Sequence, residues 1–454
     1  MIQSDNSNFS ERKQLANVWK TAWPAVFESF FTSLAGMIDT LMVSSLGSAA
    51  VAAVGLTTQP KFLGLSLFIA INVATAALTA RRKGEKDRKR ANETLAEALG
   101  LTIICGMIIS LLMVGLADKI IDLCGSNAET HNSAVLYFRI IMGGMMFNII
   151  SMVINAAQRG AGNTKIAMYT NIISSIVNIF GNYVLIGGHW GFPKLGIKGA
   201  ALATVFGTVV ACVISILSLF REEAFLSVFY IWRERLWRQY QSIKMILKLS
   251  SSVFTEQVLM RIGFMMTAIM AADMGTSAMA AHQVGMNALS LSFSLGDGMQ
   301  AAAVALIGQS LGENNKKQAK KYGFLCQKAG IAMALLMALF YIFFGEELYR
   351  LFFEEEQIVK MGVGLTRIIT VIVIFQISAV IFNGCLRGAG DVIYTMISSC
   401  ISVTFIRTAA SYVCCYVFGW GIYGIWMGIM SDQLSRLIFS SLRFKSGKWM
   451  EIKI

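Results

Sequence analysis

The chain alternates between long apolar stretches and short polar ones over almost its whole length. A transmembrane α-helix needs about 20 apolar residues, and twelve stretches approach or exceed that length. They lie at about 17–43, 51–80, 94–117, 133–157, 166–188, 199–220, 247–272, 278–310, 324–344, 361–386, 392–416 and 420–442. This pattern predicts an all-α integral membrane protein with twelve transmembrane helices.

The composition supports a membrane protein and excludes other classes. Of the 454 residues, 56% are hydrophobic and 14% are charged. Soluble domains have roughly 45–50% apolar and about 25% charged residues, so a soluble enzyme or a disordered chain is excluded. The eight cysteines form no C-x-x-C pair and the three histidines are scattered. We therefore expect no metal cluster, no disulfide framework and no cofactor.

The basic residues are distributed very unevenly between the two sides of the predicted membrane. The formal charge is +13. With a cytoplasmic N-terminus, 25 basic residues fall on the cytoplasmic side and 4 on the opposite side. Positively charged loops stay in the cytoplasm, so both termini are predicted there and no nucleic-acid partner is needed to explain the charge. Residues 1–16 are polar, and we expect no cleaved signal peptide.

The two halves of the chain resemble each other at a constant offset of 228 residues. Five features coincide after this shift: Glu28 with Glu256, LGSAAVAA with MGTSAMAA, KGEKDRKRA with LGENNKKQA, Asn155 with Asn383, and RGAG (159–162) with RGAG (387–390). We therefore predict two parallel six-helix lobes with a central cavity, as in secondary transporters. The N-lobe is 1–220 (helices 1–6), and the C-lobe is 247–454 (helices 7–12). Between them, 221–246 is a cytoplasmic linker that combines aromatic residues with arginine, which also suits an interfacial helix.

Transport energy is expected to come from an ion gradient, because no Walker-type nucleotide motif occurs. Asp39 lies deep in the first apolar stretch, where a charge costs at least about 2.5–3.5 kcal/mol. It can take up a proton or, with amide and hydroxyl oxygens around it, hold Na⁺. Asn178, Asn182 and Thr204 can supply those oxygens. Both findings have a structural alternative to ion binding. Asp39 can form a hydrogen bond that only holds helices together, and the two asparagines can connect neighbouring helices in the same way.

The first apolar stretch also carries a proline and a second carboxylate. Glu28 lies eleven residues before Asp39, which leaves only about 20° between them around a helix. Pro24 removes a backbone hydrogen bond and permits the helix to bend, unless it lies in the first helical turn. A helix of this kind can convert protonation into movement.

The second half offers further candidates for a substrate cavity. Glu256 and Arg261 lie on the seventh stretch, and Gln283 on the eighth. The alternative for Glu256 is a satisfied polar network between helices. Asp432 and Arg436, four residues apart, are expected to pair with each other for structural reasons. Arg367 and Arg407 have no evident partner in the sequence.

Several motifs in order resemble bacterial multidrug and toxic compound extrusion (MATE) transporters, and among them the branch typified by DNA-damage-inducible protein F. They are Pro24, Glu28, GMIDTLMVSSLGSAAVAAVGL (36–56), RGAGNT (159–164), AAHQV (280–284), GQSLGENN (308–315) and LRGAGD (386–391), within a match from about 16 to 440. The resemblance implies two V-shaped lobes and export of hydrophobic organic cations in exchange for H⁺ or Na⁺.

The resemblance also implies roles for single residues. Asp39 matches the coupling aspartate of the first helix, Pro24 the proline at which that helix bends, and Asn178 and Thr204 polar partners of the site. Asn182 stands where this branch usually has a second aspartate, which puts a relay of several carboxylates and Na⁺ affinity in doubt.

We therefore predict an ion-coupled antiporter that exports drugs or toxic compounds by alternating access. It is expected to be a monomer in the cytoplasmic (inner) membrane of a bacterium, with membrane lipids and small organic cations as its partners. The alternative is a lipid-linked glycan flippase, which would need basic residues in its cavity to meet pyrophosphate. An integral-membrane enzyme would need a nucleophile–base or metal constellation, and the sequence shows none.

Overall fold

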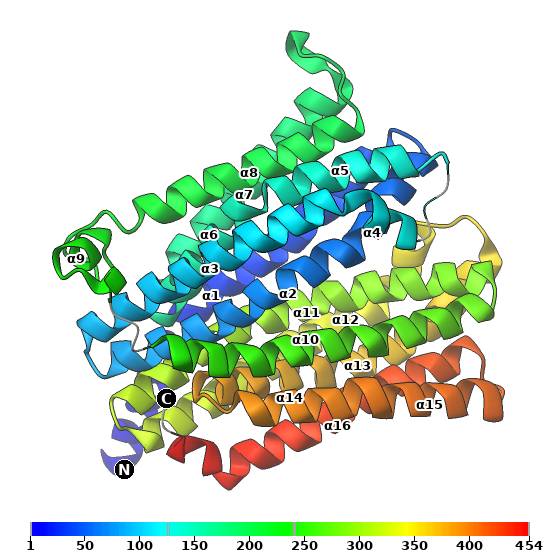
Figure 1. Ribbon diagram of the computed structural model, residues 1–454. Helices are drawn as coiled ribbons and strands as arrows, with labels where there is room; N and C mark the ends of the chain where they lie inside the picture. The colour runs from blue at the N-terminus through cyan, green and yellow to red at the C-terminus, as the bar shows by residue number, and fades with distance from the viewer. Residues whose placement is uncertain (1, 125, 127, 239–241, 453–454) are drawn as a thin grey trace. The chain divides into compact units, whose positions relative to one another are not determined.

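A computed structural model describes residues 2–124, 126, 128–238 and 242–452 (Figure 1). The side chains of residues 2–13, 48, 49, 272 and 276 lie outside that description. The chain forms two compact units. One is Phe30–Ser250, and the other combines Met1–Ser29 with Ser251–Ile454. The long helix α1 (Ile2–Ser44) contributes to both units and has Pro24 inside it.

The described residues of both units form helices and connecting turns. Phe30–Ser250 contains the end of α1 followed by α2 (Ser48–Gly84), α3 (Arg88–Gly115), α4 (Ala117–Leu123), α5 (His131–Gly143), α6 (Met145–Gly160), α7 (Thr164–Gly187), η1 (His189–Gly191), α8 (Ile197–Leu217), α9 (Val228–Arg233) and η2 (Leu236–Arg238). The other unit contains the start of α1, most of α10 (Ile243–Asp273), α11 (Thr276–Gly312), α12 (Lys316–Arg350), α13 (Glu356–Gly388), α14 (Val392–Cys400), η3 (Ile401–Arg407), α15 (Thr408–Tyr412), η4 (Val413–Val417), α16 (Ile422–Ser446) and η5 (Lys448–Glu451).

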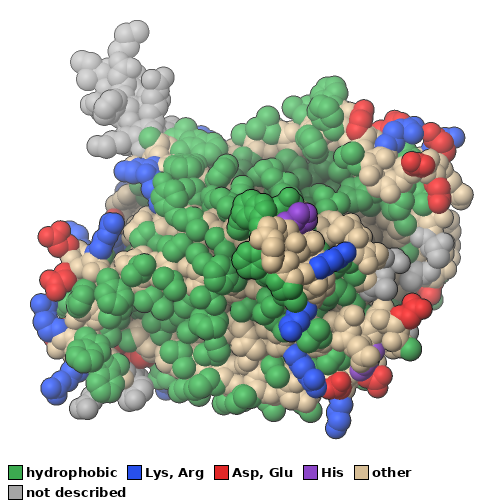
Figure 2. All heavy atoms as spheres, turned by 90° about the horizontal axis from the view of Figure 1, so that it is seen from above, with side chains coloured by type: hydrophobic (Ala, Val, Ile, Leu, Met, Phe, Trp, Pro, Cys, Tyr) green, Lys and Arg blue, Asp and Glu red, His purple; other side chains and the backbone are tan. Residues whose placement is uncertain are grey.

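The helices have the length and apolar surface of membrane spans. Within the described residues, ten helices are long and apolar enough to cross a bilayer, or eleven if α5 and α6, bent by 45° at their junction, form one span. Large apolar side chains such as Leu111, at 75% exposure, lie on the outside. Figure 2 shows hydrophobic side chains over much of one face, with most charged side chains toward its two sides and a few Lys or Arg side chains nearer the middle. The integral membrane fold is thus confirmed, while the count of twelve is not reached.

The twelfth predicted span corresponds to α16. Its 25 residues are long enough to cross a bilayer, but they include Asp432, Arg436 and two basic residues in the last turn. These charges lower its mean hydropathy, so its place in the membrane stays a prediction. The first turns of α1 and the last turns of α16 lie at the same end of their unit (Figure 1).

The internal repeat extends to backbone conformation and helix capping. The side chain of Asp87 accepts a hydrogen bond from the backbone of Arg90 at the start of α3, and Asn315 accepts one from Gln318 at the start of α12. Capping at the same repeat position shows that the two sequences fold alike locally. Positive φ angles also recur 228 residues apart, at Gly47 and Gly275 (98° and 102°), Lys86 and Asn314 (57° and 58°), and Gly162 and Gly390 (88° and 86°).

The first glycine of each RGAG motif allows two helix backbones to approach closely. A Cβ atom at Gly160 of α6 would lie 2.4 Å from the carbonyl oxygen of Ala76 in α2. A Cβ atom at Gly388 of α13 would lie 2.7 Å from the carbonyl oxygen of Val304 in α11. Both distances are shorter than any real contact of this kind, so the packing requires glycine, as is common between membrane helices.

The two halves differ most clearly where the second one departs from α-helical geometry. The helix α7 runs without interruption from Thr164 to Gly187, whereas the repeat-related segment contains two π-helical stretches, η3 and η4. In η3, Thr404 donates its hydroxyl hydrogen to the carbonyl oxygen of Leu259 in α10 at 3.0 Å. Such π-helical segments are frequent at functional sites.

The segment predicted as a linker, 221–246, contains only the short helices α9 and η2 among its described residues, before α10 begins. Arg88 of α3 donates hydrogen bonds to the carbonyl oxygens of Glu222, Ala224 and Phe225. The segment is part of the compact unit Phe30–Ser250. The predicted lobe boundaries stay a prediction. Trp232 and Trp237 remain 77% and 51% exposed, as an interfacial segment would require.

Candidate functional site

The four predicted coupling residues lie in the unit Phe30–Ser250, on three helices. Asn182 of α7 donates from Nδ2 to Oδ1 of Asp39 in α1 at 2.5 Å. One turn away on α7, Asn178 donates from Nδ2 to Oγ1 of Thr204 in α8 at 3.0 Å. Thr204 in turn donates to the backbone carbonyl oxygen of Ala200 at 3.0 Å. The structure therefore brings Asp39 and Asn182 together directly, and Asn178 and Thr204 as a second pair beside them.

An apolar cluster next to these residues holds the helices in place. Val43 lies one turn after Asp39, Ile186 one turn after Asn182, and Ala200 one turn before Thr204, and all three are buried in this cluster. Val54 of α2 packs against it. The cluster therefore lies one turn away from the polar group on each of α1, α7 and α8 and fixes the helices that carry it.

Two residues of this site were missed by sequence reasoning. Tyr137 of α5, 4% exposed, forms a side-chain hydrogen bond with Thr204 and interacts electrostatically with Asp39. Lys61 of α2 interacts electrostatically with Asp39 as well. A tyrosine in an apolar stretch gives no clear signal, but Lys61 is the single charged residue between positions 51 and 80, which could have drawn attention to it.

The site offers oxygen atoms of three kinds to a hard cation. Asp39 provides a carboxylate, Asn178 and Asn182 provide amides, and Thr204 provides a hydroxyl group. Oδ1 of Asn182 is buried and accepts no hydrogen bond from any residue that the structure describes. Such a set can hold a proton on the carboxylate or coordinate Na⁺. In the described part of the chain, no three His, Cys, Asp or Glu side chains are grouped as a transition-metal site would require.

The candidates for a substrate cavity belong to the other unit. Glu256 accepts a hydrogen bond from Nη2 of Arg387 at 2.8 Å, and the two side chains are 1% and 10% exposed. Its negative charge is therefore already compensated, which favours the polar-network alternative for this residue. Glu28 is also buried, Arg261 is half-buried and Gln283 is exposed. Pro24 is buried in α1, and the next two residues pack against Gly298 of α11.

A buried charge cluster in the same unit contains the partner that the sequence did not reveal for Arg407. Asp432 accepts from Arg407 at 2.6 Å and from Arg436 at 3.0 Å, and none of the three side chains exceeds 10% exposure. The expected pair of Asp432 and Arg436 is confirmed. Arg407, 25 residues before Asp432, is the additional partner. Asp432 lies 228 residues after Thr204, so this cluster occupies the repeat position of the first-half site.

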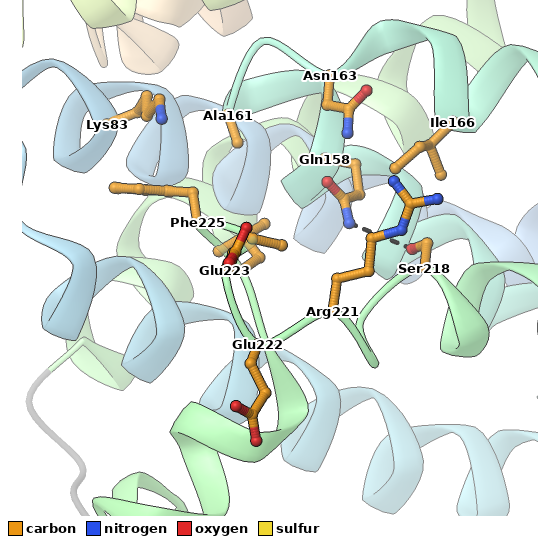
Figure 3. A pocket seen from close by; sticks show the side chains of 12 residues that line it. Lys83, Gln158, Ala161, Asn163, Ile166, Ser218, Arg221, Glu222, Glu223 and Phe225 are labelled. Atoms are coloured by element: carbon orange, nitrogen blue, oxygen red, sulfur yellow. Dashed lines mark hydrogen bonds between the residues drawn. The ribbon is translucent and has the colours of Figure 1, made fainter.

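A cavity of about 620 Å³ lies within Phe30–Ser250 (Figure 3), and Asp39 is not among the residues that line it. Lys83, Asn163 and Arg221 line it, and Gln158 donates to Ser218 at 3.2 Å across its wall. The ring of Phe225 lies 4.0 Å from Nζ of Lys83. Glu222 and Glu223 also contribute to the lining, so the cavity has both charges and selects neither anions nor cations. None of the predicted site residues lies in it.

Comparison with known proteins places the chain in a family. The MatE family model matches residues 24–184 and 253–413. A probable multidrug resistance protein NorM of Thermotoga maritima is 30% identical over 443 residues, which cover 96% of this chain and 93% of that protein. An uncharacterized transporter, YisQ, of Bacillus subtilis is 24% identical and covers 96% of this chain and 95% of its own length.

Solved structures show the same fold. A transporter of the MOP superfamily from Pyrococcus furiosus, described as having a binding pocket of reverse polarity, superposes with a TM-score of 0.88 at 22% identity. The match covers 96% of this chain and 97% of that one. A multidrug resistance MATE family transporter in an outward-facing conformation gives the same values. The assignment to the branch of DNA-damage-inducible protein F stays a prediction. The chain belongs to the MatE family and is a MATE membrane transporter rather than an enzyme.

Proposed function

We propose that this protein is an ion-coupled antiporter that exports hydrophobic, cationic drugs or toxic compounds from the cytoplasm. The family and the names of its relatives support efflux of small molecules. The observation that carries the coupling is Asp39, a carboxylate on a membrane-spanning helix that is held by the Asn182 amide. An ionised carboxylate costs several kcal/mol in an apolar environment, so proton or ion binding there changes the stability of the helix arrangement.

Coupling follows from the two charge states of Asp39. The ionised carboxylate accepts the hydrogen bond from Asn182, whereas protonation or Na⁺ binding neutralises its charge and weakens that bond. Because Asp39 and Pro24 share α1, a change at Asp39 can alter the bend of this helix. Alternating access requires two conformations of the protein, and ion binding must favour one of them over the other. We propose that α1 changes its conformation when the ion binds.

The proposed cationic cargo follows from the acidic side chains of the cavity candidates. We assign the buried Glu28 as the acidic anchor for the cargo, because Glu256 is neutralised by Arg387. Lys61 beside Asp39 is an observation that favours the alternative of an anionic cargo, as in a lipid-linked glycan flippase. We place the protein in the cytoplasmic membrane of a bacterium as a monomer, with both termini in the cytoplasm.

The experiment is dye transport into everted membrane vesicles. Ethidium uptake is measured with a pH gradient alone and with a Na⁺ gradient alone, for the wild type and for Asp39→Asn. We expect one gradient to drive uptake in the wild type and neither to drive it in the variant. Asp118→Asn is the control, because the Asp118 side chain is 57% exposed and pairs with the exposed Arg139 and the half-buried His131. Uptake by Asp39→Asn at the wild-type rate would exclude the coupling role.

A further inference from the structure

Lys61 places a positive charge inside an otherwise uncharged apolar stretch. It lies on α2 directly after Pro60 and is half-buried, and no other charged residue occurs between positions 51 and 80. A lysine near the centre of a bilayer costs at least about 2.5–3.5 kcal/mol. A charge of this kind is retained in membrane helices when it pairs with another charge or serves a function. The identity of its partner therefore matters.

The partner is Asp39. Val54, two turns before Lys61 on the same face of α2, packs against the cluster that contains Val43, one turn after Asp39. Across this pair of helices Asp39 and Lys61 act on each other electrostatically, without a direct ion pair. From α5, Tyr137 is a further titratable group under the influence of Asp39. The neighbours on α7 and α8, which are Asn178, Asn182 and Thr204, carry no charge. With Asp39 ionised and Lys61 protonated, the site is electrically neutral.

One acceptor in this site has no donor. Asn182 is fully buried and donates its amide hydrogen to Asp39, but its own Oδ1 accepts no hydrogen bond. A buried acceptor without a donor costs about 1–3 kcal/mol. Two kinds of ligand can satisfy this oxygen together with the Asp39 carboxylate. One is a cation such as Na⁺, and the other is the ammonium group of Lys61, which has three donors.

We propose that Lys61 is the resident counter-cation of Asp39 and takes the place of Na⁺, so that this site couples to protons alone. The proposal rests on the proposed function, in which Asp39 is the coupling group. A Na⁺ ion entering beside Lys61 would have to lose its water next to a fixed positive charge, which opposes binding. A proton needs no such space.

Proton uptake at Asp39 changes the net charge of the site. One proton from water forms an O–H bond on Asp39, the hydrogen bond from Asn182 to the ionised carboxylate is weakened, and no covalent bond of the protein breaks. Protonation leaves the charge of Lys61 without its counter-charge, so the site changes from neutral to positive. A positive site repels a cation, and proton uptake therefore favours release of a cationic cargo from this unit.

The test measures Na⁺ binding, which does not depend on identifying a cargo. Purified protein in detergent is incubated with radioactive sodium at constant ionic strength, for the wild type, Lys61→Gln, Lys61→Arg and the double variant Lys61→Gln with Asp39→Asn. We expect no specific binding in the wild type or in Lys61→Arg, which keeps the charge. We expect saturable binding in Lys61→Gln, and loss of that binding in the double variant, because the Asp39 carboxylate is needed.

Two results would overturn the inference. One is specific Na⁺ binding by the wild type that disappears in Asp39→Asn. The other is a folded Lys61→Gln protein, shown by gel filtration, that binds no Na⁺. If Lys61→Gln does not fold, the wild type and Lys61→Arg still test the proposal. Specific Na⁺ binding by either protein contradicts it, and the lack of Na⁺ binding by both supports it. Failure of drug efflux would leave these binding results intact, so the two proposals can fail separately.

Discussion

Asp39 and Asp432 occupy related places in the two halves but differ in burial and in the charges around them, since Asp39 is half-buried and Asp432 is fully buried. Asp432 lies at the repeat position of Thr204 and accepts hydrogen bonds from Arg407, Arg436 and Gln433. Asp39 accepts one from Asn182 and interacts with Lys61 at longer range. The negative charge of Asp432 is compensated by two buried arginines, which suits a structural role. The less constrained Asp39 can change its charge, which suits coupling.

Replacing Asp432 by asparagine should destabilise the protein strongly. The change leaves Arg407 and Arg436 buried with no counter-charge, and breaking a buried pair in this way costs about 3–5 kcal/mol. Thermal unfolding in detergent should show a large decrease in melting temperature. The control Asp118→Asn removes an exposed ion pair with Arg139 and should cost less than about 1 kcal/mol. Equal decreases in the two variants would show that the Asp432 cluster is not needed for stability.

The sequence predicted part of this residue-scale picture. Asp39 stood out because charges are rare in apolar stretches, and Asp432 with Arg436 because they lie one helical turn apart. The pairing of Arg407 with Asp432, and of Glu256 with Arg387, joins residues on different helices. No local pattern reports such contacts, because they depend on how the helices pack. Lys61 was visible in the sequence, but its nearness to Asp39 was not.

At the scale of helices, glycine determines how closely the elements pack. In both halves the first glycine of RGAG, which is Gly160 or Gly388, lies against the backbone of a neighbouring helix. The sequence predicted the repeat of this motif but gave no reason for its glycine. The reason is steric and appears only when the facing carbonyl oxygen, of Ala76 or Val304, is known.

Replacing Gly388 by alanine should lower stability, although alanine is the better helix former. The added Cβ atom would lie 2.7 Å from the carbonyl oxygen of Val304, and overpacking of this kind costs about 1–3 kcal/mol. The control is Gly100→Ala in α3, where a Cβ atom meets nothing within 4 Å. The control should be neutral or stabilised by up to about 1 kcal/mol. Thermal unfolding measures both, and a stabilised Gly388→Ala variant would contradict the packing account.

The segment after α8 is fixed to α3 through a few polar contacts. Arg88 donates to three of its carbonyl oxygens, and Asn92 bonds both to the carbonyl oxygen of Phe225 and to the backbone nitrogen of Ser227. Arg88→Ala should release residues 222–230 and accelerate cleavage by chymotrypsin after Phe225, Phe229 or Tyr230. Lys89→Ala, an exposed neighbour, is the control. Cleavage at the same rate in both variants would show that Arg88 does not hold the segment.

At the scale of the whole molecule, the sequence predicted the membrane fold and the repeat well. Hydrophobic stretches give the spans because backbone groups in a bilayer must be paired within helices. The boundaries of the two lobes stay a prediction. The hydropathy pattern did not predict the short helices α4, α9 and η2, because their segments are polar or amphipathic. The distribution of basic residues predicts the topology, with the loop after α4 on the outside.

The topology can be tested with a natural cysteine. Cys124 follows α4 and is exposed, while the other seven cysteines are buried or half-buried. Partial burial raises the pKa of the Cys124 thiol, so thiolate forms less readily there and labelling needs a mildly alkaline buffer. A membrane-impermeant maleimide should label Cys124 in intact cells, and Cys124→Ser should abolish the signal. Labelling that requires opened cells would reverse the predicted orientation.

The central claim is that Asp39 exchanges protons against cargo, and drug-induced proton release tests it most directly. Purified protein is placed in weakly buffered detergent solution with a pH-sensitive dye, and a transported cation such as ethidium is added. We predict proton release by the wild type and by Asp118→Asn, and none by Asp39→Asn. Ethidium binding, followed by its fluorescence, must occur in all three. Equal proton release from Asp39→Asn, or drug binding to the wild type without any release, would contradict the account.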